Sequence, residues 1–174
     1  MIRLLLSDLR RHAGSWAWTA VVAVVAASAI AGQFRVAHGA FAAAEAAGDP
    51  TMIDGAESVS GIIIIGVVFA AVAVLSSTSN LAVSQRERDH GLWKALGMSP
   101  SMVRLVIQGQ LLALGTLTSL VAVPLSLPIS RFMMHRLVSD GAALPGAVPQ
   151  WKPADLIWTA IISAGTLVIG GRGA

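Results

Sequence analysis

The segment Ser84 to Met102, SQRERDHGLWKALGMSPSM, combines dense charge with a small apolar face, as a protein-docking segment does. Leu92, Trp93 and Leu96 form that face over one or two helical turns, and a solvated linker does not need one. At about 2.5 to 3.5 kcal/mol per charge at mid-bilayer, its charges would cost on the order of 15 kcal/mol in lipid, so the segment lies outside the membrane. Five formal charges fall within nine residues: Arg86, Glu87, Arg88, Asp89 and Lys94.

The same segment contains residues that end one helix and begin the next. Gly97 suits a left-handed helix C-cap, Ser99 suits an N-cap, and Pro100 suits the first helical position, where a missing N–H is harmless. This spacing predicts a short helix that lies crosswise before the next span. A solvated turn with incidental apolar residues is the alternative interpretation.

Catalytic and nucleic-acid chemistry is not indicated. The chain has no cysteine, which excludes disulfides, Cys-ligated metals and thiol catalysis. No Gly-rich phosphate loop is present, and the basic residues are scattered rather than interleaved with stacking aromatics. We therefore expect no enzyme activity, no bound cofactor or metal, and no nucleic-acid partner. The four histidines also lack metal-ligand spacing: His12, His38, His90 and His135.

The composition indicates an all-α membrane protein. Hydrophobic residues make up 55% of the 174 residues, charged residues 12%, and the mean hydropathy is +0.74. Because an unpaired peptide group costs several kcal/mol in lipid, the spans must be helices. The sequence predicts one domain over residues 1–174, with four spans at about 15–34, 61–83, 105–127 and 154–170. The fourth span is marginal, since 17 residues reach only about 25 Å of the ~30 Å hydrocarbon core.

The basic residues predict the orientation. With both termini and segment 84–102 on one side, that side holds eight Lys and Arg residues against four on the other. The positive-inside rule then places the segment and both termini in the cytoplasm, with the chain in the plasma (inner) membrane and in contact with its lipid.

The N-terminus predicts an amphipathic helix at the membrane interface. Ile2, Leu5, Leu6 and Leu9 recur at helical spacing among arginines. The alternative is a signal peptide with Ala29-Ile30-Ala31 as its cleavage site, which has small residues at the first and third positions.

Two connections are expected on the other side, Arg35 to Ser60 and Pro128 to Pro153. The first has a break at Asp49-Pro50 and room for one short helix around residues 41–47. Pro124 and Pro128 predict a kink or an end in the third span.

Small and polar residues inside the spans predict helix contacts. Ala23, Ala27 and Ala31 form a row that permits close packing on another helix. The polar cluster at residues 76–80 predicts hydrogen bonds to neighbouring helices or to the backbone, with the lining of a polar passage as the alternative.

Residues 86–99, RERDHGLWKALGMS, resemble the cytoplasmic segment E-R-x-x-E-I-G-L-L-K-A-L-G-A-S of the FtsX-like (MacB-type) permease domain of ABC transporters nearly position for position. Residues 110–115, QLLALG, are similar to the start of that family's third span. The resemblance covers the four-span frame and is strongest over residues 84–115.

The resemblance implies a non-catalytic permease subunit that couples ATP hydrolysis by a separate ABC ATPase to export or to mechanical signalling across the membrane. The partners it implies are that ATPase, which uses the ATP, and a second permease half in a homo- or heterodimer. It also implies roles for a set of residues in a coupling helix that contacts the ATPase. Leu92, Trp93 and Leu96 would fill a cleft, Arg88, Asp89 and Lys94 would form a polar rim, and Gly91 and Gly97 would permit close approach and the turn.

Three features depart from the family pattern. His90 stands where relatives have Ile, and the first outer connection has about 25 residues where many relatives insert a large domain. The sequence also stops directly after the fourth span, which predicts either a half or a truncated permease. A membrane scaffold or regulator that binds a cytoplasmic partner without ATP-driven transport is the alternative function.

Overall fold

A computed structural model describes residues 13–48, 50–84 and 99–170, which form four long helices and no sheet. The helices are α2 (Ala13–Ala47), α3 (Pro50–Ser84), α5 (Pro100–Ser139) and α6 (Pro153–Gly170). All four are long and apolar enough to span a membrane, which confirms the predicted class of fold. The predicted amphipathic N-terminal helix and coupling helix lie outside the described residues.

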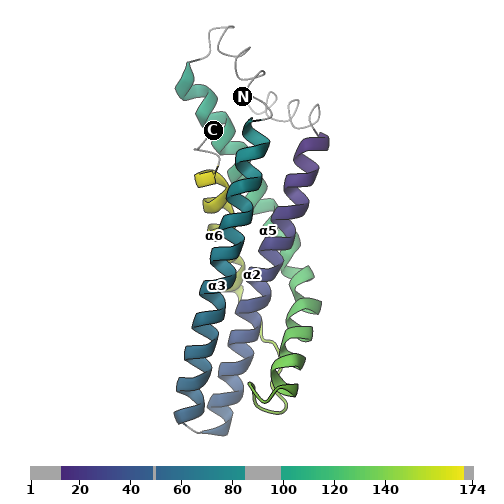
Figure 1. Ribbon diagram of the computed structural model, residues 1–174, viewed down its shortest axis with the longest axis vertical. Helices are drawn as coiled ribbons and strands as arrows, with labels where there is room; N and C mark the ends of the chain where they lie inside the picture. Colours follow the sequence, from purple (N-terminus) through teal and green to yellow (C-terminus); the bar gives the residue numbers. More distant parts are fainter. Residues whose placement is uncertain (1–12, 49, 85–98, 171–174) are drawn as a thin grey trace.

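The bundle has two ends, which differ in the helices that reach them (Figure 1). At the end we call proximal, α2 and α5 begin and α3 and α6 end; the opposite end is called distal. At 1.5 Å per residue, the 35-residue helices α2 and α3 are about 52 Å long and the 40-residue α5 about 60 Å, against about 27 Å for the 18-residue α6. Three helices therefore continue past α6 at the distal end.

The connection predicted at Arg35 to Ser60 is almost entirely helical, so the prediction of a loop with one short helix was wrong. Helix α2 runs on to Ala47, Gly48 adopts a left-handed φ of 69°, and α3 begins at Pro50. Alanine is the best helix former, and this stretch is rich in it. Glycine and proline are the residues expected at such a helix end and helix start. The predicted break near Pro50 is thus confirmed, but as a tight turn.

Helix α5 continues through Pro124 and Pro128 to Ser139, so the predicted end near residue 127 was also wrong. Figure 1 shows α5 changing direction between its teal first half and its green second half. A proline inside a helix lacks the N–H that would bond the carbonyl four residues earlier, and this favours a kink. Ser126 Oγ donates to the Val123 carbonyl at 2.7 Å, beside the first proline.

Helix α2 is the centre of the bundle and contacts each of the other three helices. One cluster of buried apolar side chains joins all four helices, and a second joins α2, α5 and the connection 140–152 at the distal end. The predicted small-residue row, Ala23, Ala27 and Ala31, is fully buried within this chain. It therefore serves packing inside the subunit, where small side chains let helix backbones approach.

Two glycines mark the closest helix contacts. A Cβ added at Gly115 of α5 would lie 2.5 Å from the Cα of Ala164 in α6. A Cβ at Gly170 would overlap Ser79 Oγ and lie 2.6 Å from the Cα of Ser76 in α3. Helix α6 is thus held against α5 and α3 by backbone-to-backbone packing.

Two side chains of the polar cluster at residues 76–80 donate hydrogen bonds to the backbone of their own helix. Thr78 Oγ1 donates to the Val74 carbonyl at 2.7 Å, and Ser79 Oγ donates to the Ser76 carbonyl at 3.1 Å. The prediction of backbone hydrogen bonds is confirmed for these two side chains.

Candidate functional site

The residues predicted to contact an ATPase lie between α3 and α5, outside the described part of the chain, and their roles stay predictions. They are Arg88, Asp89, Gly91, Leu92, Trp93, Lys94, Leu96 and Gly97. The described residues on either side fix where this segment is attached. Helix α3 ends at Ser84 and α5 begins at Pro100, both at the proximal end (Figure 1).

The start of α5 confirms the predicted capping. Ser99 has extended backbone angles, φ −67° and ψ 148°, and its side chain accepts a hydrogen bond from the Met102 N–H at 3.3 Å. Pro100 occupies the first helical turn, where its missing N–H leaves no bond unmade. The segment 85–98 is therefore followed by a helix whose first residue is locally fixed.

A second candidate site, which the sequence did not predict, lies where α6 begins. We call Arg35, His38 and Asp155 the distal polar cluster. Asp155 is only 2% exposed, and one of its oxygens, Oδ2, accepts the Lys152 N–H at 2.9 Å. The other, Oδ1, lies 3.4 Å from Nδ1 of His38, an ion pair when the imidazole is protonated. The first turn of a helix favours such a negative charge, because its free N–H groups point at it.

Arg35 connects this cluster to the proline-containing part of α5. Its Nη2 donates to the Val123 carbonyl at 3.1 Å, and its own carbonyl accepts the Gln150 N–H at 3.0 Å. One residue of α2 thus bonds both α5 and the connection that leads into α6. Ser28 of α2 adds a weaker contact to the Ala122 carbonyl at 3.4 Å.

The polar face of α6 continues inward from Asp155. Thr159 and Ser163 follow it at four-residue spacing, and both are fully buried. Their hydroxyls have no hydrogen-bond partner among the described residues. A buried polar face of this kind is costly in a membrane helix and is typical of a contact between helices or of a functional site.

The contacts of Arg35 and His38 join α2 to α5, to the connection before α6 and to α6 itself. Among the described residues, no group of three His, Asp or Glu side chains comes close enough to hold a metal ion. A signal for the cluster was present in the sequence, since Asp155 is the single charge in the fourth span, and an ionisable residue inside a span is a candidate functional residue by default. The sequence could not identify His38 as the partner of Asp155, because the two residues lie far apart along the chain and share no motif.

Comparison with known proteins gives one family. Residues 61–171 match the FtsX-like permease C-terminal family, and the match covers α5, α6 and most of α3 together with the segment between α3 and α5. Neither a curated protein nor a solved structure matches the chain. Members of this family are typically non-catalytic transmembrane subunits that pair with ABC ATPases. The chain is a membrane protein, with four candidate membrane-spanning helices in its described part, and belongs to the FtsX-like permease family.

Proposed function

We propose that the chain is the permease subunit of an ABC transporter and passes the motion of a cytoplasmic ATPase to the far side of the membrane. Family membership carries the proposal, because the matched region includes the whole segment between α3 and α5. In this proposal Leu92, Trp93 and Leu96 occupy a cleft of the ATPase, and Arg88, Asp89 and Lys94 surround them. Apolar anchors within a charged rim are the arrangement that interface energetics favours.

Charge supports the orientation. The proximal side carries eight of the twelve Lys and Arg residues, counted with the termini and the segment 85–98. We therefore place the proximal end in the cytoplasm of a cell bounded by this plasma (inner) membrane. A second permease half, identical or similar, completes the transporter, and the ATPase alone uses the ATP.

The described contacts support transmission along the bundle. Helix α5 begins directly after the proposed docking segment and extends about 60 Å to the distal end. Arg35 bonds the carbonyl of Val123, the residue before Pro124, and also bonds the connection that leads into α6. A displacement of the first turn of α5 is thereby delivered to α2 and α6 together.

Co-purification tests the docking step. The full chain and its Leu92→Asp and Trp93→Asp variants are purified with the candidate ABC ATPase, and the retained ATPase is quantified. We expect each variant to lose most of it, because burying one unpaired carboxylate costs several kcal/mol. Val148→Asp is the matched control, since Val148 is an exposed apolar residue of the distal connection.

Two outcomes would contradict the proposal. If both variants retain the ATPase as the parent does, the segment is not the docking site. If the complex forms but ATP hydrolysis is the same with and without the chain in nanodiscs, the chain is a scaffold or regulator rather than a coupled permease.

A further inference from the structure

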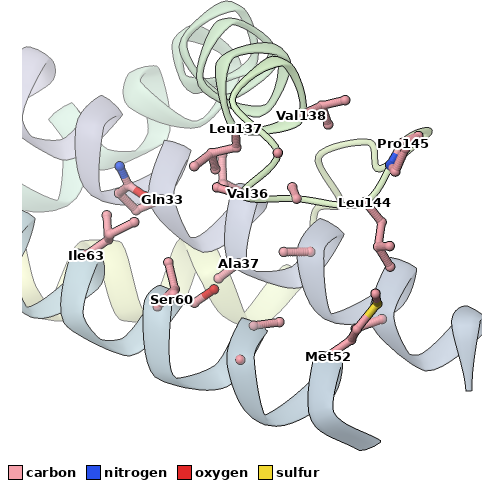
Figure 2. Close-up of a pocket in the computed structure, with 18 residues that line it drawn as sticks. Gln33, Val36, Ala37, Met52, Ser60, Ile63, Leu137, Val138, Leu144 and Pro145 are labelled. Atoms are coloured by element: carbon pink, nitrogen blue, oxygen red, sulfur yellow. The ribbon is translucent and has the colours of Figure 1, made fainter. Parts of the chain in front are cut away.

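A pocket of about 400 Å³ lies at the distal end, on the face of α2 that is turned away from α6. Figure 2 shows residues of α2, α3, the end of α5 and the connection after α5 surrounding one space. Its volume falls within the range of about 300 to 1,000 Å³ that is typical of small-molecule sites. The wall is predominantly apolar and includes Val36, Ala40, Ala56, Val59, Leu137 and Leu144.

The level of the pocket relative to the membrane follows from α6. This helix is about 27 Å long and must cross a hydrocarbon core of about 30 Å, so its first residue, Pro153, lies at the distal boundary. The bond from Gln150 to Arg35 and the contact of His38 with Asp155 place residues 35–38 of α2 at the same level. On α2 the pocket extends from Gln33 to Ala44, about 16 Å along the helix, so most of it lies beyond the hydrocarbon.

Few side chains of the lining can hold a water molecule in place. A bound water needs two to four polar partners, and Gln33 and Ser60 supply the only polar side chains of the lining. Gln33 already donates to the sulfur of Met133 at 3.3 Å. No charged side chain is part of the wall, so an ionic ligand has no counter-charge there.

The pocket is continuous with surface that faces lipid. Its deepest residue on α3 is Ile63, and Ala70 and Val74, which follow Ile63 on the same face of that helix after two and three turns, are exposed. A hydrocarbon chain can therefore pass from the bilayer core into the pocket without leaving apolar surroundings.

We propose that this pocket binds one acyl chain of a phospholipid from the distal leaflet and holds it partly above the hydrocarbon core. The polar headgroup region is about 5 to 8 Å deep on each side of a bilayer, so a chain that fills the pocket crosses it sheltered by α2 and α3. The site needs no ATPase, and it stands whether or not the proposed docking segment is correct.

Photolabelling tests this site directly. The full chain is placed in nanodiscs that contain a phosphatidylcholine with a diazirine at the end of one acyl chain, and adducts are located by tandem mass spectrometry. Residues 137–145 are the diagnostic segment, because they line the pocket and lie beyond the hydrocarbon. We expect adducts there as well as on the lipid-facing residues of α3.

A pocket-filling variant and a matched control make the test specific. Gly55 lines the pocket and has no atom within 4 Å of an added Cβ; Gly61, on another face of the same helix outside the pocket, is equally open. We expect Gly55→Trp to reduce labelling of residues 137–145 about tenfold, because the indole fills the apolar space that the methylene groups would occupy, while Gly61→Trp leaves the labelling unchanged. Ala56→Phe is a second filling variant if Gly55→Trp does not fold.

The proposal is overturned if residues 137–145 carry no adduct in the parent chain, or if filling the pocket leaves their labelling unchanged. Labelling that persists in variants that cannot hold an ATPase separates this site from the docking proposal.

Discussion

Helices α2 and α3 are equally long, 35 residues each, but their surroundings differ. The most apolar stretch of α3 has a mean hydropathy of 2.7 and only 11% of it is buried, whereas that of α2 has 1.8 and 61% is buried. The more hydrophobic helix is thus the more exposed one. In a membrane the surroundings are as apolar as the protein interior, so small and polar residues rather than large apolar ones mark the helix that packs inside.

The contacts of the two helices show the same contrast. Buried residues of α2 include alanines, Ser28 and Gln33, and its Arg35 bonds α5. The exposed face of α3 presents Ile62, Ile65 and Phe69. A substitution in α2 should therefore act on the fold, while the same substitution on the outer face of α3 should not.

The largest effect is expected from a leucine placed at a glycine of each helix. A Cβ at Gly39 of α2 would overlap the Val148 carbonyl oxygen and lie 2.8 Å from Met134 Cε, while Gly66 of α3 has open space. Gly39→Leu should lower the free energy of unfolding by about 4 kcal/mol or prevent folding, which is more than overpacking usually costs, because the clash is with backbone atoms. Gly66→Leu should lower it by less than about 0.5 kcal/mol. Unfolding in a detergent series measures both. Equal losses would refute the contrast.

A cavity on the buried edge of α3 should have the next largest effect. Leu75 is 0% exposed and Phe69 is 71% exposed. Leu75→Ala should cost about 2 to 3 kcal/mol, because lost packing atoms are not replaced, and Phe69→Ala less than about 0.5 kcal/mol. The same unfolding measurement decides this, and a larger loss at Phe69 would show that its face is covered by protein rather than lipid.

Removing the buried carboxylate opposite α2 should have a smaller effect. Asp155→Ala deletes the acceptor of the Lys152 N–H and the partner of His38, and should cost about 2 kcal/mol. Glu57→Ala, at an exposed position of α3, should be neutral within about 0.5 kcal/mol. Asp155→Asn retains an acceptor oxygen and should fall between the two. The thermal unfolding midpoints of the three variants, measured in one detergent, test this order of stability. Three equal midpoints would contradict it.

The smallest effect is expected at a purely local contact. Ser99→Ala removes the N-cap of α5 and should cost about 1 kcal/mol, while Ser101→Ala, at the neighbouring exposed hydroxyl, should cost less. Amide exchange at the Met102 N–H, which Ser99 accepts, should accelerate in the first variant alone. If the two variants behave alike, the cap does not define the start of α5.

Local chemistry and hydropathy were enough to predict four spans, the cap at Ser99 and Pro100, and the family. Two helix ends were placed wrongly because Arg35 and the prolines of α5 were taken as the ends of helices. The contact of Arg35 with the connection before α6 places this residue near the level at which α6 begins, and α2 continues past that level without ending. Hydropathy could not predict which helix is buried, because lipid and the protein interior are equally apolar. The distal polar cluster could not be predicted either, because His38 and Asp155 are far apart in the sequence.

The left-handed turn at Gly48 has a mechanical consequence. It joins the distal ends of α2 and α3, each about 52 Å long, through a very short connection. Neither helix can therefore shift along its axis without moving the other. A rod of that length pivoted by about 10° at its foot swings its tip by about 9 Å. A small rotation of the α2–α3 hairpin about its proximal end would therefore produce a large displacement of its distal turn.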